Sequence, residues 1–234
     1  MPREVVVVSG VRTAIGTYGG SLKDIPPTEL AALVVRESLA RAGVQGQDVG
    51  HVVFGHVVNT EPKDMYLSRV AAINGGCAET TPAFNVNRLC GSGLQAIVSA
   101  SQAIALGDCD IAIGGGAENM SRAPYASLTS RWGARMGDTK MVDMMVGALH
   151  DPFHNIHMGV TAENVAAKYG ITREMQDAAA VESHNRAERA TAAGLFKDQI
   201  VPVMLKSKKG DVAYATDEHF RPGCKLEDLS LIHI

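Results

Sequence analysis

The amino-acid sequence predicts an α/β fold: a mixed, largely parallel sheet flanked by helices, followed by an inserted α/β loop domain. Strand-like and helix-like segments alternate four times before Gly116, which is typical of a parallel sheet with helices on its faces. After Gly116, residues 117 to 160 are rich in Met, Gly, Ser, Arg and His and have weak periodicity. We therefore predict an incomplete N-terminal subdomain at residues 1–117, a loop domain at 118–228 and a tail at 229–234.

The first part contains four expected strands, with helices between them. The strands are "EVVVVSG" (4–10), "HVVFGHVV" (51–58), "PAFNVN" (82–87) and "DIAIGGG" (110–116). The helices are "TELAALVVRESLARAG" (28–43), "MYLSRVAAING" (65–75) and "LQAIVSASQAIALGD" (94–108). Gly43 is placed where a helix ends in a left-handed residue.

The second part contains two expected helices and one strand. The helices are "TAENVAAKYG" (161–170) and a longer segment (172–194), which Thr172 caps and Gly194 ends. "QIVPVML" (199–205) reads as a strand and "KSKKGD" (206–211) as a polar loop or hairpin.

Composition narrows the function classes. The chain has 234 residues, is 46% hydrophobic and carries a net charge of −3. No basic cluster is longer than "KSKK", so no electrostatic footprint indicates a nucleic acid or a membrane surface as partner. The apolar run Val5 to Val8 is too short for a signal peptide or a membrane span. The four cysteines show no CxxC spacing, so we expect reduced thiols in the cytoplasm.

Cys90 stands between a strand-like run and a helix-like run, in "VNRLCGSGL". Glycines at 91 and 93 allow a tight turn, and the start of the following helix favours a thiolate and can hold an oxyanion. The residue types alone leave two interpretations open, a nucleophile or a buried inert thiol. Cys77, Cys109 and Cys224 lack this setting and are expected to be inert.

The histidines of "HDPFHNIH" (150–157) raise the question of a metal site. Their spacing fits no closed zinc pattern and no cysteine joins them, so no metal is predicted. Arg221 is either an ordinary surface arginine or a contact for phosphate or adenine. His51, His56, His184 and His219 are taken as structural or solvated, and Glu118, Asn119 and Met120 are expected to line the site.

Several long motifs, in order, resemble the thiolases, and most of all the bacterial β-ketothiolases of broad specificity and biosynthetic type. They are "REVVVVSGVRTAIGTYGGSLKD", "NRLCGSGLQAI", "GDCDIAIGGGAENMSRAPY" and "HMGVTAENVA", and the likeness runs from Arg3 to about Asp228. The resemblance implies the layered thiolase fold, and a Cys90 that carries an acyl group between CoA thioesters, so that 3-ketoacyl-CoA is formed or cleaved. A role in fatty acid metabolism or polyhydroxyalkanoate biosynthesis would follow.

The same resemblance implies a binding site for coenzyme A. Leu149, His157, Met158 and Arg221 match positions that contact CoA in the family, with Arg221 at its nucleotide end. It implies no permanently bound cofactor, since CoA thioesters are the substrates, and a homotetramer when the protein is full length.

Three motifs of the family do not occur in this sequence. They are Gly-His-Pro, Cys-x-Gly-Gly-Gly and Asn-Glu-Ala, which supply the activating histidine, the second cysteine and the oxyanion water in the second half of thiolases. The ending "LSLIHI" departs from the family and can be spelled CTGTCTCTTATACACATC, like a transposon end from a sequencing library. We therefore expect a truncated chain without the C-terminal subdomain, poorly soluble and inactive by itself.

Three other functions are weighed against a thiolase. A ketosynthase-type condensing enzyme shares the fold, but "LCGSG" and "HMGVTAEN" favour a thiolase. A non-catalytic acyl-CoA-binding module would keep its effect without Cys90. A cysteine-dependent hydrolase lacks an accompanying motif.

Overall fold

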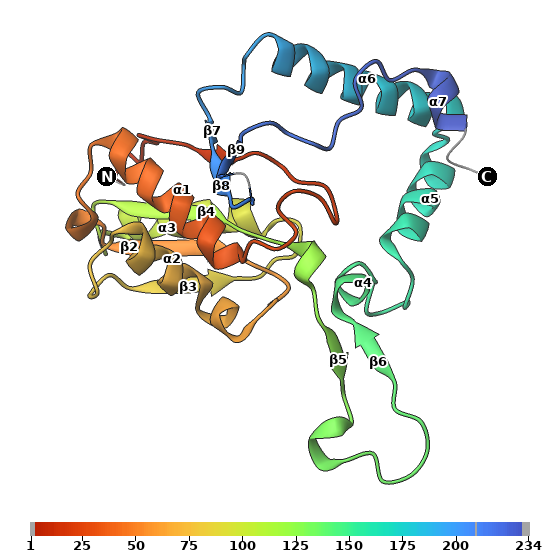
Figure 1. Cartoon of the computed structure of the whole chain (residues 1–234), viewed down its shortest axis with the longest axis horizontal. Coiled ribbons are helices and arrows are strands. Elements are labelled where there is room, and N and C mark those ends of the chain that lie inside the picture. Colours follow the sequence, from red (N-terminus) through yellow and green to blue (C-terminus); the bar gives the residue numbers. More distant parts are fainter. Residues whose placement is uncertain (1–2, 209, 231–234) are drawn as a thin grey trace. The chain divides into compact units, whose positions relative to one another are not determined.

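The computed structural model describes residues 3–208 and 210–230, which form two compact units (Figure 1). The first unit holds the residues up to Ala148 together with Gln199–Thr216. The second holds Leu149–Asp198 and the residues from Asp217 onward. The boundaries expected after residues 117 and 228 stay predictions, and residues 231 to 234 of the expected tail lie outside the described residues.

A three-stranded parallel sheet is the centre of the first unit. Strand β2 (His51–Gly55) lies between β3 (Ala83–Val86) and β4 (Ala112–Gly116). Val53 pairs with Phe84 on one side and with Gly114 on the other. The parallel sheet expected from the alternating pattern is confirmed, and its three carboxyl ends reach the same edge.

Helices cover both faces of this sheet, because the central strand β2 has apolar side chains on each face. Val52 and Phe54 pack with α1 (Pro27–Ala42) and α2 (Leu67–Gly75), whereas Val53 packs with α3 (Ser92–Leu106). Successive side chains of a strand point to opposite faces, so α1 and α2 lie on one side and α3 on the other (Figure 1). Gly43 ends α1 in the left-handed conformation, as predicted.

The strand expected at residues 4–10 is not formed. These residues have no strand assignment, Val6, Val7 and Val8 are exposed, and the first strand is β1 (Arg12–Thr13), which pairs with β7 (Ile200–Val201). A strand exists only where a neighbour completes its backbone hydrogen bonds, and no described segment does so for the valine run. An apolar β-rich pattern was therefore insufficient there.

Two short antiparallel hairpins complete the first unit. Strands β5 (Tyr125–Ser127) and β6 (Met141–Asp143) pair within the stretch of weak periodicity, and α4 (Met144–Ala148) follows them. Strands β8 (Val203–Leu205) and β9 (Val212–Tyr214) flank the expected "KSKKGD" hairpin. Short 3-10 helices span Gly46–Asp48, Pro62–Tyr66, Met120–Arg122 and Ser130–Trp132.

The second unit is helical. Helix α5 (Met158–Tyr169) begins three residues earlier than the motif suggested, because His157 caps it. Helix α6 (Arg173–Ala192) is capped by Thr172, as predicted, and α7 (Leu226–Ser230) packs against it.

One segment, Leu89–Leu106, is long and apolar enough to cross a membrane by length and composition alone. It contains α3, whose Ala96 and Ala100 are buried against the sheet, while Leu94 and Leu106 are 70% and 80% exposed. The high hydropathy of α3 therefore comes partly from a face that the described residues do not cover.

Candidate active site

Cys90 lies in a tight connection between the end of β3 and the start of α3. Leu89 adopts a left-handed backbone with φ of 46°, which costs a branched residue about 1–2 kcal/mol. Hydrogen bonds hold this conformation: Ser92 Oγ donates to the Leu89 carbonyl over 2.6 Å and accepts the Arg88 N–H over 2.9 Å. The turn thus presents the next residue, Cys90, at the surface.

The helix after Cys90 begins without a side-chain cap in the described structure. Gly91 is its first flanking residue, and it has no side chain that could accept the free N–H groups of the first turn. The Ser92 N–H donates to the Leu89 carbonyl over 3.0 Å, so among the described residues the N–H groups of Gly93 and Leu94 remain without an acceptor at the positive end of the helix dipole. They can stabilise an oxyanion formed by attack on a carbonyl.

Gly55 at the end of β2 and Gly116 at the end of β4 lie next to the first turn of α3. A Cβ atom on Gly55 would lie 2.5 Å from the Ser92 carbonyl carbon and 2.7 Å from the Gly93 nitrogen. One on Gly116 would lie 3.4 Å from the Gly93 Cα. The carboxyl end of β2 therefore contacts the first turn of α3 with almost no free space, and the end of β4 lies at ordinary contact distance from it.

The other three cysteines differ from Cys90, and all four lie among the described residues. Cys77 and Cys224 are buried, and Cys109 is partly buried, whereas Cys90 is exposed. Burial raises the pKa of the Cys77 thiol. Burial, with the carboxylates of Asp108 and Asp110 nearby, raises the pKa of the Cys109 thiol. The interpretation of Cys90 as a buried thiol is therefore wrong, and its role as a nucleophile stays a prediction.

Three of the four residues matched to CoA contacts lie together in the second unit. The Met158 N–H donates to the Leu149 carbonyl over 2.8 Å, and His157 Nδ1 accepts the Gly159 N–H over 3.0 Å as the cap of α5. The rings of His150 and His157 meet edge to face at 5.4 Å. Leu149, His157 and Met158 thus form one surface at the start of α5.

Arg221 lies elsewhere in the second unit, against α6. Its N–H donates to His184 Nδ1 over 3.1 Å, and the Gly223 N–H donates to Glu188 over 2.8 Å. These bonds fix the backbone of the loop and leave the Arg221 residue exposed. Among the residues that the structure describes, no three His, Cys, Asp or Glu side chains gather as they would around a metal ion.

Asn119, which was expected to line the site, holds two segments of the chain together. Asn119 is buried, and its Nδ2 donates to the carbonyl oxygens of Leu22 and Ile25 over 2.9 and 2.8 Å. It thereby ties the loop before α1 to the end of β4. Met120 is partly exposed.

His56 lies near this turn, although the sequence analysis did not place it at the site. It follows Gly55 directly and is buried, rather than solvated. Its position at the carboxyl end of a parallel strand was the available signal, because such ends build the sites of α/β proteins.

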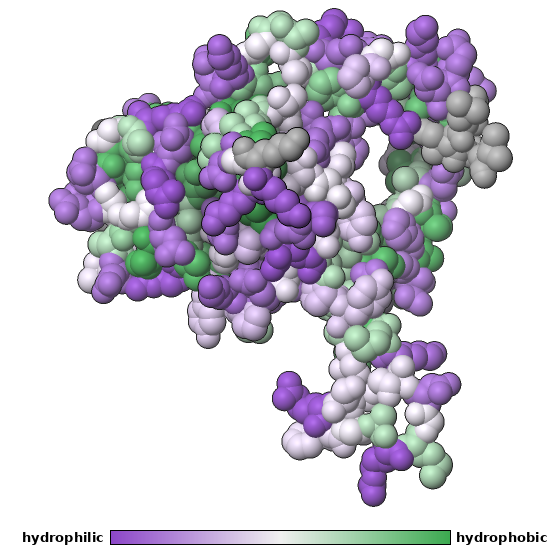
Figure 2. Space-filling view, in the orientation of Figure 1, coloured by the Kyte–Doolittle hydropathy of each residue, from purple (hydrophilic) through white to green (hydrophobic). Residues whose placement is uncertain are grey.

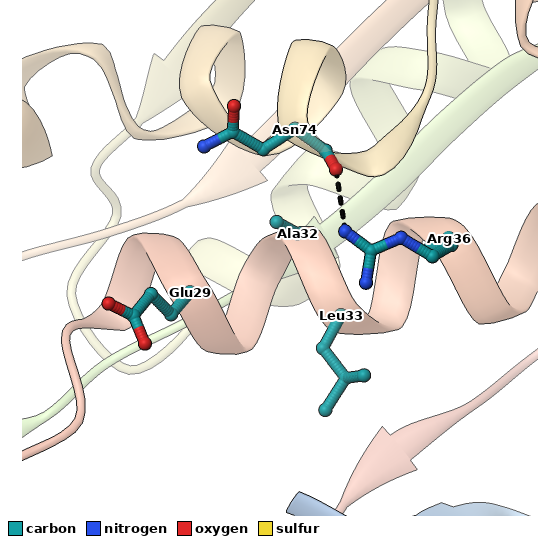
Figure 3. Close-up of a pocket in the computed structure, with 5 residues that line it drawn as sticks. All are labelled: Glu29, Ala32, Leu33, Arg36 and Asn74. Carbon is teal, nitrogen blue, oxygen red and sulfur yellow. Dashed lines mark hydrogen bonds between the residues drawn. The ribbon is translucent and has the colours of Figure 1, made fainter. Parts of the chain in front are cut away.

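A separate pocket lies between α1 and α2 (Figure 3). It has a volume of about 490 Å³ and is lined by Glu29, Ala32, Leu33, Arg36 and Asn74. Arg36 donates to the Asn74 carbonyl over 2.8 Å across it. None of the predicted site residues lines this pocket, so it is distinct from the Cys90 turn.

Known proteins are similar to this chain in both sequence and fold. Beta-ketothiolase BktB of Cupriavidus necator is 70% identical over 98% of this chain and 58% of its own length. An acetyl-CoA acetyltransferase of the same organism is 49% identical over 97% of this chain and 58% of its own length. The chain therefore spans about 58% of the length of these relatives.

Solved structures confirm the layered thiolase fold. The acetyl-CoA acetyltransferase of Bacillus anthracis matches with a TM-score of 0.92 and 40% identity, over 96% of this chain and 57% of that one. Human mitochondrial 3-ketoacyl-CoA thiolase matches with a TM-score of 0.92 and 38% identity, over 95% of this chain and 57% of that one. The family model for the thiolase N-terminal domain matches residues 5–233. The chain belongs to the thiolase family, and what it matches is the N-terminal domain of that family.

Proposed function

We propose that this chain supplies the acyl-carrying cysteine of an acetyl-CoA C-acyltransferase, a thiolase that forms or cleaves 3-ketoacyl-CoA. The exposed Cys90 at the uncapped start of α3 supports this most directly. The similarity to a β-ketothiolase and to acetyl-CoA acetyltransferases supports the reaction class.

In the proposed reaction the Cys90 thiolate attacks the carbonyl carbon of an acyl-CoA thioester. A bond forms between Cys90 Sγ and that carbon, the bond from the carbon to the CoA sulfur breaks, and CoA leaves as a thiolate that takes up a proton. The N–H groups of the first turn of α3 stabilise the oxyanion of the intermediate. Exchange between two thioesters is nearly balanced in energy, so the step runs in both directions.

Condensation follows when a second acetyl-CoA loses its α-proton and its carbon attacks the acyl group on Cys90. A carbon–carbon bond forms, and the Cys90 thiolate is released. We assign the base for this proton, and the histidine that activates Cys90, to the Cys-x-Gly-Gly-Gly and Gly-His-Pro motifs that the resemblance to thiolases implies and that this sequence lacks. The proposed activity therefore belongs to a longer protein than the chain.

CoA is the proposed ligand of the second unit. The surface formed by Leu149, His157 and Met158 offers apolar and imidazole groups at the start of α5. Arg221 is exposed on a loop whose backbone is fixed, and a guanidinium suits a phosphate or the adenine ring. No permanently bound cofactor is part of this proposal.

A homotetramer of the full-length protein is proposed from the resemblance to thiolases, and the β5–β6 hairpin offers a surface for contact between subunits. Its tip carries Leu128, Trp132 and Met136, which are 78%, 88% and 97% exposed, and Figure 2 shows apolar residues among hydrophilic ones on it. Large apolar side chains exposed together are typical of an interaction site. A location in the cytoplasm and a role in fatty acid or polyhydroxyalkanoate metabolism complete the proposal.

The test is to trap the acyl group on the full-length gene product. After mixing with acetyl-CoA, mass spectrometry of the digested protein should find an added acetyl group on the Cys90 peptide. Cys90→Ala should abolish this adduct and the cleavage of acetoacetyl-CoA, whereas Cys109→Ala, which replaces a partly buried thiol, should keep both. Full activity of Cys90→Ala would instead favour a non-catalytic acyl-CoA-binding module, and malonyl-dependent condensation would favour a ketosynthase.

A further inference from the structure

His56 lies where three strands end together, directly beside the Cys90 turn. Its N–H donates to the Val86 carbonyl over 3.1 Å at the end of β3, and the Ala117 N–H donates to the Gly55 carbonyl over 3.1 Å at the end of β4. The imidazole is 1% exposed. His56 is thus the residue at which the paired part of the sheet stops.

One edge of the ring links the ends of β2 and β4. Nδ1 lies 2.8 Å from the Ala117 carbonyl oxygen and donates its proton to it. The adjacent Glu118 forms the reciprocal link, since its carboxylate accepts the N–H groups of Val57 and Val58 over 2.9 and 3.1 Å. Glu118 Oε1 is also 3.4 Å from His56 Nδ1. Each strand end therefore holds the other through a side chain.

The other edge of the ring makes no hydrogen bond to the described residues. His56 Nε2 has no hydrogen-bond partner among the described residues and lies 3.8 Å from Asp64 Oδ2. Asp64 is 0% exposed, and its Oδ2 is satisfied by Thr60 N, Thr60 Oγ1 and Glu61 N. A buried polar atom without a partner costs about 1–3 kcal/mol, and an apolar ring would avoid that cost. Such a costly group in a buried position is typical of a functional constraint.

The neighbouring glycines connect His56 to the nucleophile turn. Gly55 precedes His56, and a Cβ atom there would lie only 2.5 Å from the Ser92 carbonyl carbon. Gly116 precedes Ala117, and a Cβ atom there would contact the Gly93 Cα at 3.4 Å. A shift of the end of β2 toward α3 would therefore displace the first turn of α3. Cys90 lies two residues before Ser92, the first residue of α3.

We propose that His56 is a positioning residue for Cys90: by holding the ends of β2 and β4 together, it sets the position of the N–H groups at the start of α3. This rests on the proposed function, in which those N–H groups stabilise the oxyanion. His56 acts through the strand ends and is not itself a catalytic residue.

The test compares three substitutions of His56 in the full-length gene product. In His56→Asn the amide nitrogen replaces Nδ1, in His56→Gln it replaces Nε2, and His56→Phe keeps a ring without a donor. His51→Asn is the matched control, since His51 lies at the other end of β2, with its ring 5.4 Å from the Phe84 ring and tilted against it by 51°. The readouts are the melting temperature, the alkylation rate of Cys90 by iodoacetamide measured on its peptide, and kcat and KM for acetoacetyl-CoA cleavage.

We expect His56→Phe and His56→Gln to lower the alkylation rate of Cys90 and kcat by roughly tenfold or more, with KM for CoA within about twofold. His56→Asn should recover both rates to within roughly threefold of the wild-type values, and His51→Asn should change neither. A folded His56→Phe with wild-type alkylation and kcat would overturn the proposal. If His56→Phe does not fold, the comparison of His56→Asn with His56→Gln decides. Equal alkylation rates of Cys90 in these two variants would overturn the proposal, and a faster rate in His56→Asn would support it.

Alkylation needs no CoA, so this result is independent of the proposed reaction. If Cys90→Ala retained thiolase turnover, the proposed function would fail, while the alkylation comparison among the His56 variants would still report on the position of Cys90.

Discussion

The backbone around Cys90 places a thiol at the surface where a helix begins, and the other thiols have no such place. Cys77 and Cys109 have a raised pKa, so at a given pH a smaller fraction of each is thiolate, which is the form that reacts. We predict that iodoacetamide at about pH 8 modifies Cys90 of the full-length protein first, and Cys77, Cys109 and Cys224 more slowly. Peptide mass spectrometry over time measures the four rates, with Cys90→Ala as the control.

The same experiment, repeated over a range of pH, measures how the alkylation rate of each cysteine depends on pH. Because a raised pKa moves the thiolate form to higher pH, the rates of Cys77 and Cys109 should still be rising at a pH where ordinary exposed thiols have levelled off. Alkylation of Cys109 that matched or exceeded that of Cys90 at every pH would contradict the assignment of Cys90 as the reactive thiol.

Gly55 is the second residue whose environment makes a sharp prediction. In Gly55→Ala the new methyl group would meet backbone atoms of Ser92 and Gly93, which cannot rotate away as a flexible side chain can. We expect a loss of stability on the order of 1–3 kcal/mol and slower alkylation of Cys90, because α3 must shift. Urea unfolding and the alkylation rate measure the two effects.

Gly147→Ala is the matched control for this substitution. A Cβ atom on Gly147 would meet no heavy atom within 4 Å, and α4 tolerates an alanine well. Equal stability of the two alanine variants would show that the end of β2 does not contact α3 as closely as the structure has it.

For single residues, the sequence predicted those features that depend on neighbouring residues in the chain. The glycines around Cys90 and the change from strand to helix pattern predicted an accessible turn, and Cys90 is exposed. His56 and Asn119 were not recognised as links between segments. Asn119 bonds carbonyl groups 94 and 97 residues away, and His56 bonds the carbonyl of a residue 61 positions away, so neither contact leaves a pattern in nearby residues.

At the scale of elements, strands were predicted well where a neighbour in the chain completes them. The segments at 51–58, 82–87 and 110–116 contain β2, β3 and β4, which are joined in sequence order by the helices between them. The run at 4–10 has the same apolar character but no described partner, and β1 instead pairs with β7, which lies far along the chain. The pairing of β5 with β6 was missed because few of its residues alternate in hydropathy.

Helix α6 allows a prediction at the level of one element. Its first turn depends on Thr172, whose Oγ1 accepts the Met175 N–H over 3.3 Å. None of the described residues of α6 is fully buried, so packing compensates little for a lost cap. We expect Thr172→Ala to destabilise the unit that contains α6 by about 1 kcal/mol.

Serine is the matched substitution for this test, because it keeps the hydroxyl group that caps the helix. Thr172→Ser should therefore remain within a few tenths of a kcal/mol of the wild type in urea unfolding followed by circular dichroism. Equal destabilisation by serine and alanine would assign the effect to the methyl group of Thr172 rather than to the cap.

At the scale of the whole molecule, the described residues leave large apolar side chains exposed on and near the sheet unit. Val7, Leu94 and Leu106 are 84%, 70% and 80% exposed, and the outer face of α3 has no described neighbour. Exposed apolar surface of this extent is typical of a surface that another polypeptide covers. The chain also spans only about 58% of the length of its relatives, which leaves room in a full-length protein for that cover.

We therefore predict that the 234-residue chain, expressed by itself, aggregates, binds a hydrophobic dye such as ANS and shows no cleavage of acetoacetyl-CoA. Full-length protein is the positive control, and its Cys90→Ala variant sets the baseline for activity. If the remaining part of the gene product is expressed separately and refolded with this chain, dye binding should fall and turnover should return, because the apolar face and the missing base are supplied together. Measurable cleavage by the purified chain alone would mean that a base for Cys90 lies within these residues, and the division of catalytic groups proposed above would then be wrong.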